Sequence, residues 1–225
     1  MAASVSFVIP VLNEAAYIEV LLAQLRARFA QAELLVVDGG STDDTAELAR
    51  RHGASVLASP PGRALQMNVG GEAASGDYVF FLHADSVPTM DADILAGYLA
   101  GAPKWGFCPV HLSCDALAYR VIEWFINRRS ALTQVATGDQ MLFVRRELFA
   151  STGGFDAIPL MEDVAYCKRL RQIAAPLILS EPVRTSSRRW EQRGVVRTVL
   201  QMWGLRLAYW LGVSPARLQR IYYGA

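Results

Sequence analysis

Two acidic residues that follow apolar runs are the side chains in this sequence best placed to do chemistry. Asp85 follows Tyr78–Leu82, five apolar residues with strong strand propensity, and Asp38 follows Glu33–Val37. An apolar run without alternation is typical of a parallel strand covered on both faces, and ligands of such sheets bind beyond the carboxyl ends of the strands. We therefore expect both acids at one ligand-binding edge of a sheet. For Asp85 the alternative is that residues 85–88 form only a turn.

The residues around Asp38 suit the recognition of a nucleotide. Asp38 opens the segment Asp-Gly-Gly-Ser, whose glycines let the backbone approach a ligand, and Ser41–Asp44 can cap a helix. Neither a G-x-G-x-x-G loop nor a P-loop follows the first strand, because Pro10–Glu14 stands there. A diphosphate bound without such a loop needs another counter-charge. We expect Mg²⁺ or Mn²⁺, held by hard oxygen ligands at Asp85.

Alternating strands and helices in the first 80 residues would position these acids. Repeated strand-helix units imply right-handed crossovers and a largely parallel sheet, the architecture of a nucleotide-binding half. The expected strands are Val5–Ile9, ended by Pro10, Glu33–Val37, Ser55–Ala58 and Tyr78–Leu82. Three helices are expected. The first runs from a cap at Asn13 to Phe29, the second follows Ser41–Asp44 and runs to Arg51, with Gly53 ending it, and the third runs from Arg63 to Ala74.

The pattern after Pro88 is less regular, and we expect its strands to join the same sheet. The expected strands are Trp105–Leu112, Gln140–Val144 and two short edge strands, Pro176–Leu179 and Pro182–Ser186. The expected helices are Asp91–Leu99, Ala116–Arg129, Met161–Ile173, Val195–Leu211 and a short one opened by Ser214.

Length and composition favour one α/β domain. The chain has 225 residues, of which 52% are hydrophobic and 19% charged. Its start lacks the basic region of a signal peptide, so we expect a cytoplasmic protein. No apolar run approaches the roughly 20 residues that span a bilayer. The three cysteines, Cys108, Cys114 and Cys167, form no Cys-x-x-Cys pair, and we expect buried thiols rather than disulfides.

Positive charge is concentrated at the carboxyl end of the chain. From Arg184 to Ala225 there are eight arginines and one acid, Glu191, so this tail carries +7 and the net charge of +1 leaves −6 elsewhere. Such asymmetry suggests an anionic partner. The helix expected at Val195–Leu211 could lie on an anionic membrane surface, or its apolar face could pack on the domain or on a second subunit. That face is formed by Val195, Val199, Met202 and Leu205.

Five short motifs in order across 160 residues resemble family 2 glycosyltransferases, which have the GT-A fold. Each motif alone is common, but their order and spacing are specific. They are Val8–Glu14, Val36–Thr45, Gly62–Asn68, Phe81–Asp85 and Met161–Asp163.

Further segments extend the resemblance to nearly the whole chain. Thr137–Gln140, Gly153–Phe155 and Thr185–Trp190 resemble a bacterial subgroup, the rSAM/selenodomain-associated transferases, some labelled arsenosugar-biosynthesis glycosyltransferases. The resemblance implies a single Rossmann-like GT-A domain with a mostly parallel sheet flanked by helices. Its parts would be a nucleotide-binding half (1–88), an acceptor half (89–186) and a helical C-terminal extension (187–225).

On the donor side, the resemblance assigns the nucleoside and diphosphate to one set of residues and the metal to Asp85. The metal motif of the family is usually Asp-x-Asp, and His83 stands at its first position here. His83 could reach the ribose or the metal, since residues two apart in extended backbone share a face. The donor-binding residues are Pro10, Asn13, Glu14, Asp38, Arg63, His83 and Ala84.

On the acceptor side, the resemblance makes Asp163 the general base that takes the proton of the attacking acceptor. Glu162 would point elsewhere, because adjacent helical residues do not share a face. Asp139 would lie near the acceptor or the sugar. Arg189 and Trp190 resemble the end of the Gln-x-x-Arg-Trp motif of processive members, although Ser186 stands where the glutamine would.

We therefore interpret the chain as an inverting, metal-assisted glycosyltransferase that uses a nucleoside-diphosphate sugar and an acceptor of unknown identity, with no nucleic-acid partner. One alternative is a sugar-nucleotide nucleotidyltransferase, which typically carries a glycine- and lysine-bearing phosphate loop that is absent here. The other is a catalytically silent nucleotide-sugar binder, which would have lost the base. The residues name neither the sugar nor the nucleotide.

Overall fold

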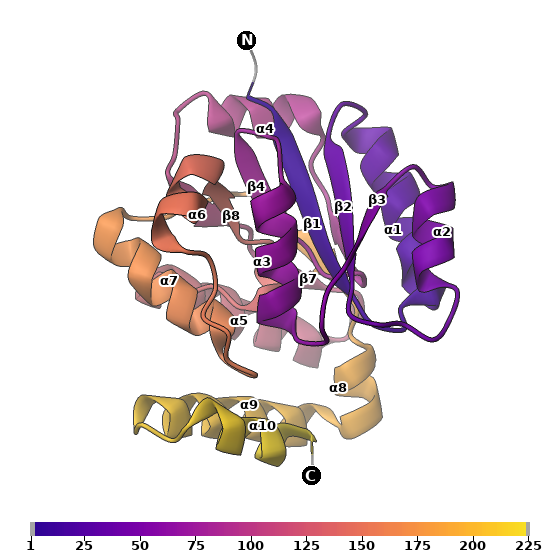
Figure 1. The fold of residues 1–225 in the computed structure, drawn as a ribbon. Helices are drawn as coiled ribbons and strands as arrows, with labels where there is room; N and C mark the ends of the chain where they lie inside the picture. The colour runs from indigo at the N-terminus through magenta and orange to yellow at the C-terminus, as the bar shows by residue number, and fades with distance from the viewer. Residues whose placement is uncertain (1–2, 224–225) are drawn as a thin grey trace.

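The computed structural model describes residues 3–223, except the side chains of Arg189, Gln192, Arg193 and Val196. Figure 1 shows its strands and helices along the chain. The strands are β1 Val5–Val11, β2 Glu33–Asp38, β3 Ser55–Ala58, β4 Tyr78–Phe81, β5 Ser86–Pro88, β6 Trp105–Phe107, β7 Val110–Leu112, β8 Phe143–Arg145, β9 Leu177–Ile178 and β10 Val183–Thr185. The helices are α1 Ala15–Arg28, α2 Thr45–Arg51, α3 Arg63–Ala73, α4 Ala92–Leu99, α5 Leu117–Thr133, α6 Arg146–Thr152, α7 Glu162–Ile173, α8 Arg188–Arg193, α9 Val195–Trp210 and α10 Pro215–Tyr223, with a 3₁₀ turn η1 at Gly138–Gln140.

A seven-stranded sheet forms the centre of the molecule, in the order β3-β2-β1-β4-β8-β6-β9. The four strands β3, β2, β1 and β4 are parallel, and β8 runs antiparallel to both of its neighbours. Strands from both halves of the chain share this sheet, as expected. The mostly parallel α/β architecture predicted from the sequence is confirmed.

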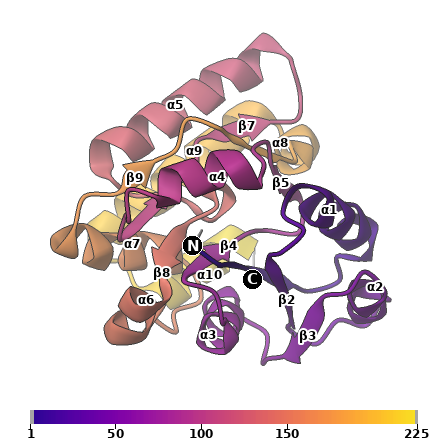
Figure 2. The ribbon, with the colours of Figure 1, turned by 90° about the horizontal axis from the view of Figure 1, so that it is seen from above.

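Both faces of the sheet are covered by helices, and alternation along β1 divides the core in two. Phe7, Ile9 and Val11 face the cluster packed by α1 and α4, whereas Val8 faces the cluster packed by α3, α6 and α7. Figure 2 shows α1 and α4 on one side of the sheet and α3 and α6 on the other. Burial on both faces explains the absence of polar alternation in β4, all four of whose residues are buried.

Helix α3 lies unusually close to the sheet because it carries two glycines at its contact surface. A Cβ atom on Gly70 would lie 2.3 Å from Val8 Cγ1 and 2.9 Å from Val37 Cγ2, and one on Gly71 would lie 2.4 Å from the Phe149 ring. Real Cβ atoms do not approach so closely. The glycines therefore set the distance between α3 and the ends of β1 and β2.

A second, three-stranded sheet, in the order β5-β10-β7, was not predicted. The expected strand Trp105–Leu112 is instead two strands in different sheets, because the chain turns away at Cys108 and Pro109 between β6 and β7. Strand β10 is central rather than an edge strand, pairing with both β5 and β7. The residues just beyond Asp85 form β5, so the sequence Ser86–Pro88 is not merely a turn.

The start of the chain corrects two further expectations. Strand β1 does not end at Pro10 but continues to Val11. Proline is tolerated there because β4 pairs only with residues 5–8, so Pro10 lies beyond the part of β1 that has neighbours on both sides. Asn13 does not cap α1. Its backbone has φ 57°, the cap position belongs to Glu14, and the Asn13 side chain turns to the neighbouring loop.

Some elements in the second half of the chain differ from the prediction, whereas the cysteines are free as expected. The helices α6 and α8 and the turn η1 were not foreseen, and strand β8 begins only at Phe143. All three cysteines are free; Cys108 and Cys167 are buried and Cys114 is half-buried.

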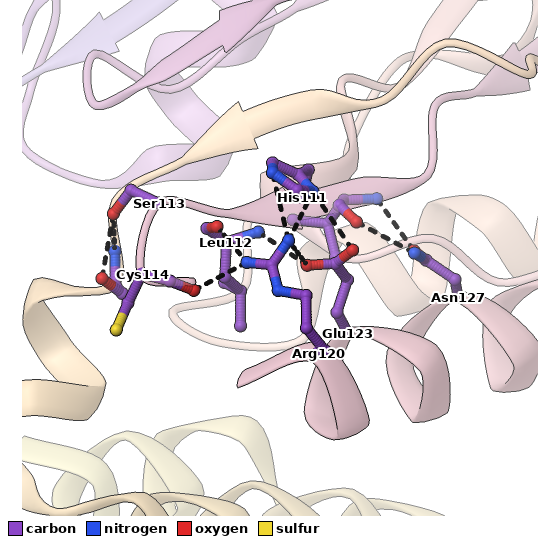
Figure 3. A network of polar contacts seen from close by, with 9 residues as sticks. His111, Leu112, Ser113, Cys114, Arg120, Glu123 and Asn127 are labelled. Atoms are coloured by element: carbon purple, nitrogen blue, oxygen red, sulfur yellow. Dashed lines mark hydrogen bonds and ion pairs between the residues drawn. The ribbon is translucent and has the colours of Figure 1, made fainter. Parts of the chain in front are cut away.

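A polar network fastens α5 to β7 around His111 (Figure 3). His111 Nδ1 lies 3.2 Å from Glu123 Oε1, and Arg120 donates to the backbone carbonyls of Leu112 and Cys114. Asn127 both donates to the carbonyl of Val110 and accepts from its N–H. His111 is therefore part of the contact between α5 and β7.

The C-terminal helices lie across the end of the molecule toward which the parallel strands run (Figure 1). The face of α9 expected to be apolar packs inward, with Val195 and Val199 against β7 and α5, and Met202 and Leu205 against α10. Packing on the domain, one of the alternatives left open by the sequence, therefore accounts for this face. Within residues 3–223, no helix combines the length and the hydropathy needed to cross a bilayer.

We expect Gly70→Ala to lower the free energy of unfolding by about 1–3 kcal/mol, because the added methyl group would push α3 away from Val8 and Val37. Urea denaturation followed by circular dichroism measures this change. The matched control is Gly97→Ala in α4, where an added Cβ meets nothing within 4 Å. That substitution should stabilise the protein by up to about 1 kcal/mol, since alanine is the better helix former. Equal effects at both sites would contradict the close packing of α3.

Candidate functional site

The two acids that follow apolar strands lie beyond the same edge of the large sheet. Asp38 is the last residue of β2 and pairs with Val11 at the end of β1, and Asp85 follows β4, the other neighbour of β1. The parallel direction of β1, β2 and β4 brings their carboxyl ends together. The sheet edge expected to bind a ligand is therefore the one that carries both acids.

The loops after β1 and β2 are joined by hydrogen bonds that orient Asp38. Asp38 Oδ1 accepts from the backbone N–H of Ser41 at 2.9 Å and from its hydroxyl at 2.6 Å. Ser41 Oγ in turn accepts from the N–H of Asn13, whose Oδ1 accepts from the N–H of Thr42 at 2.8 Å. No described residue donates to Asp38 Oδ2. One carboxylate oxygen is thus fixed and the other is available to a ligand.

Three carboxylates from different segments influence one another around Asp85. Burial raises the pKa of Asp85, the Ser86 hydroxyl opposes the rise, and the charge of Asp139 adds to it. Burial also raises the pKa of Glu14, and the negative charge of Asp85 raises it further. The loop after β1, the segment after β4 and η1 therefore bring negative charge to one place.

This donor set fits a divalent cation that is shared with a substrate. Among residues 3–223, no group of three or more His, Cys, Asp or Glu side chains forms a ready metal cage. However, Asp139 Oδ1 is buried without a hydrogen-bond partner among the described residues, and its charge acts on Asp85. Mg²⁺ and Mn²⁺ are commonly held by one or two carboxylates together with substrate phosphates. Asp85 and Asp139 supply that number.

Arg188, at the start of α8, brings a positive charge to Glu14 and Asp85, and the sequence reasoning missed it. Its charge lowers the pKa of Glu14 and of Asp85, partly offsetting burial. The guanidinium donates to the Tyr17 hydroxyl at 2.7 Å and lies 4.7 Å from the Tyr17 ring centroid. The arginine expected here was Arg189, whose side chain lies outside the described part of the chain. Two adjacent arginines cannot be told apart without the phase of the helix.

A second acidic cluster lies at the amino end of α7. Asp163 Oδ2 accepts from the backbone N–H of Gly138 at 2.8 Å, and Oδ1 accepts from the N–H of Val164 at 2.7 Å. Burial raises the pKa of Asp163, the adjacent Glu162 raises it further, and the charge of Arg63 opposes the rise. A carboxyl with a raised pKa, oriented by two N–H groups, is suited to exchange protons.

Glu162 does not point away from Asp163, contrary to the sequence expectation. Both side chains line the same small space, and Glu162 Oε1 lies 3.8 Å from the Arg63 guanidinium. The argument from helical faces fails here because both residues belong to the first turn of α7. Side chains tilt toward the amino end of a helix, so both can extend beyond that end.

Gly138 is a second residue that the sequence reasoning overlooked. A Cβ atom at Gly138 would lie 2.7 Å from His83 Nε2 and 3.3 Å from the Arg63 guanidinium. Only glycine lets η1 approach these side chains while giving its N–H to Asp163. The space enclosed by Arg63, His83, Glu162 and Asp163 is only about 10 Å³, so these side chains are packed together.

Two of the expected site residues lie elsewhere. The side chain of Ala84 is 5% exposed and belongs to the core between β4 and α4. Trp190 packs against the apolar cluster of β7 and α5. Pro10 is half-buried within β1.

Gln66 and Asn68, which the motif on α3 contained without an assigned role, hold the site together. Gln66 Nε2 donates to the carbonyls of Val11 and Val37 at 2.7 and 2.9 Å. Asn68 makes two hydrogen bonds with the backbone of Phe155, both 2.8 Å long.

The first part of the chain is similar to a known family. The family description Glycosyl transferase family 2 matches residues 6–103, which are less than half of the chain. An uncharacterized glycosyltransferase of Mycobacterium bovis is 39% identical over 102 residues, which are 45% of this chain and 44% of that protein. The match therefore spans less than half of the relative.

Solved structures extend the similarity beyond residues 6–103, at the level of the fold. TarS of S. aureus in complex with UDP has a TM-score of 0.64 at 18% identity, covering 81% of this chain and 60% of TarS. The mannosyltransferase PcManGT from Pyrobaculum calidifontis, in complex with GDP-Man and Mn²⁺, has a TM-score of 0.63 at 23% identity, covering 92% and 61%. The chain has the GT-A fold, with a helical C-terminal region.

We expect Asp163→Asn to stabilise the protein at pH 8, because it removes a buried charge beside Glu162 while its side-chain oxygen can still accept from Gly138. When folding raises the pKa of a carboxyl, the folded protein becomes less stable as the pH rises from the unfolded-state pKa through the folded-state pKa. The gain should be about 1 kcal/mol or more at pH 8, and it should vanish near pH 3.5, where both carboxyls are protonated. Thermal unfolding of both proteins at the two pH values measures it. A variant less stable than wild type at pH 8 would contradict the raised pKa.

Proposed function

We propose that the chain transfers a sugar from a nucleoside-diphosphate donor to an acceptor hydroxyl, with inversion at the anomeric carbon. The observation that carries this proposal is the arrangement of two acidic clusters on either side of η1. The first cluster, with Asp85 and Asp139, lies toward the strand ends, where Asp38 would bind the nucleoside. The second contains Asp163, which is oriented by the N–H of Gly138. The family 2 match and neighbours bound to UDP and GDP-Man support a nucleotide-sugar donor.

On the donor side, Asp38 accepts hydrogen bonds from the base or the ribose through Oδ2, while Ser41 holds Oδ1. Pro10, near the end of β1, and Asn13 and Glu14, in the loop after β1, lie on the same side. Asp85, aided by Asp139, would hold Mg²⁺ or Mn²⁺ against the diphosphate. When bound, such a cation neutralises the charge that develops on the leaving diphosphate. Neighbours bound to Mn²⁺ support this role.

On the acceptor side, Asp163 acts as the general base. The acceptor oxygen attacks the anomeric carbon and forms the new glycosidic bond, while its proton passes to the Asp163 carboxylate. The bond between the anomeric carbon and the diphosphate oxygen breaks, and the electron pair leaves with the nucleoside diphosphate. A single displacement inverts the anomeric centre. Arg188 and Arg63 are the cations placed to stabilise the departing charge.

The arrangement at Asp163 also weighs against the alternatives. A nucleotidyltransferase does not need a base beyond the sugar, and the loop after β1 contains no glycine or lysine to cradle a triphosphate. A silent binder has no use for a carboxyl that destabilises the fold at neutral pH. Both features are accounted for by glycosyl transfer.

We expect Asp163→Asn to lower turnover by roughly 100-fold or more, as the loss of a general base should, with donor affinity nearly unchanged. The wild-type rate should fall as pH is lowered through the raised pKa of Asp163, because the base must be deprotonated. Release of nucleoside diphosphate, with acceptor or with water, measures turnover, and calorimetry measures donor affinity. Wild-type turnover in the variant would remove Asp163 from the mechanism.

We expect Asp85→Ala to abolish metal-dependent nucleotide binding and His83→Ala only to weaken it or to change the preferred metal. The reason is that a carboxylate is the harder ligand and His83 is packed against Gly138 and the acceptor side. Calorimetric titration of UDP and GDP, with and without Mn²⁺, distinguishes the variants. Unchanged affinity in Asp85→Ala would place the metal elsewhere.

A further inference from the structure

A cavity of about 330 Å³ lies between α5, α7 and α9, apart from the donor side. Its walls include Arg129 of α5, Lys168 and Arg171 of α7, and Arg206 of α9. The volume is within the range of small-molecule sites. The four cationic side chains come from three helices that are distant in sequence, so the fold itself gathers them.

Few carboxylates oppose this positive charge. The ion pairs among the described residues involve none of the four cations, although the charges of Asp139 and Asp163 act on Arg129. Lys168 lies 5.1 Å from the Tyr209 ring centroid, and Arg171 donates to the Thr133 carbonyl at 2.9 Å. Arg129 Nε is buried without a hydrogen-bond partner among the described residues, and burial lowers the pKa of its guanidinium. Gathering cations in this way is unfavourable unless an anion joins them.

The cavity adjoins the candidate base. Met161 and Val164, on either side of Glu162 and Asp163 in sequence, line the cavity, whereas the two acids line the small space next to His83. The charge of Asp163 acts on both Arg129 and Tyr209, two of the cavity's walls. The cavity therefore lies beside the segment that carries the candidate base.

We propose that this cavity binds a phosphate group of the acceptor substrate, with Arg129, Lys168 and Arg206 among its ligands. Arginine and lysine bind phosphate through charge-assisted hydrogen bonds, and four cations gathered around one cavity favour a group with more than one negative charge. The inference depends on the proposed glycosyl transfer in one respect, namely that the bound molecule is the acceptor. Phosphate binding itself requires no donor and no turnover, so the two ideas can fail separately.

The outer face of α9 suggests two sources for the phosphate group. Leu200, Trp203, Leu207 and Trp210 recur at helical spacing and are 57–75% exposed, opposite the face that packs on the domain. Trp210 also lines the cavity. The phosphate therefore belongs either to a soluble molecule or to the headgroup of a lipid in contact with this helix.

The test compares Lys168→Gln/Arg206→Gln with Arg50→Gln/Lys104→Gln, which removes the same charges from exposed positions elsewhere. Sodium phosphate is titrated calorimetrically at constant ionic strength, and vesicles of phosphatidylglycerol or phosphatidylcholine are sedimented with each protein. We expect the cavity variant to lose at least tenfold in affinity for sodium phosphate, for phosphatidylglycerol vesicles, or for both, and the control to match wild type. Thermal unfolding checks that each variant is folded.

The pattern of losses identifies the source. Loss with sodium phosphate alone indicates a soluble acceptor. Loss with anionic vesicles indicates a lipid headgroup, and in that case Trp203→Glu should also abolish sedimentation while Ile94→Glu, an exposed change on α4, should not. The proposal is overturned if the cavity variant and the control bind both probes equally, or if wild type binds neither.

Discussion

The close contact between α3 and the ends of β1 and β2 is the constraint on which the rest of the site depends. Gly70 allows it, because any larger residue would meet Val8 and Val37. At this distance the Gln66 amide reaches the carbonyls of Val11 and Val37 and satisfies both. These carbonyls end the two strands whose loops carry Glu14 and Asp38. The Val11 carbonyl also accepts from the N–H of Gly39, so α3 and the loop after β2 meet at the end of β1.

The same helix connects the donor side with the acceptor side. Asn68 holds the backbone of Phe155, whose ring packs against Tyr166 of α7 with centroids 4.6 Å apart. Arg63, at the amino end of α3, faces Glu162. Helix α3 therefore positions α7 at two points: through the packing of Phe155 on Tyr166, and through the charge of Arg63 beside Glu162. The segment Gly62–Asn68, which looks like a binding motif in the sequence, mainly connects two parts of the site.

The sequence predicted the acids but not their orientation. Asp38 and Asp85 could be found because each follows an apolar run that predicts a buried strand, and Asp163 because the segment Met161–Asp163 resembles a motif of family 2 glycosyltransferases. Gly138 could not, because its importance lies in a close approach to His83 and in an N–H given to Asp163, and neither leaves a periodic signal. Arg188 could not be separated from its neighbour, since helix phase decides which arginine faces the acids.

The pairing of strands in the small sheet was not predicted. Its strands, β5, β7 and β10, are each three residues long, too short to show alternation that would indicate their sheet. Yet this sheet brings the segment after β10 back to Asp85: Ser86 and Thr185 hydroxyls lie 2.8 Å apart, and the N–H of Ser186 donates to the Asp85 carbonyl. Arg188 follows two residues later. The sequence thus placed Asp85 correctly at the end of a strand, but it did not predict the strand pairing that brings the charge of Arg188 to it.

Helix α9 has apolar residues on both sides, and only one side is explained by the fold. Its inner face buries Leu205 against Leu218 and Tyr222 of α10, and Val195 and Val199 pack on the cluster of β7 and α5. Trp203 and Trp210 remain 61% and 75% exposed on the other side. A surface helix of a globular protein normally presents charged and polar residues there, because exposed tryptophans gain nothing from folding. The outer face of α9 is therefore not explained by the stability of the domain, and one of its residues, Trp210, also lines the cationic cavity.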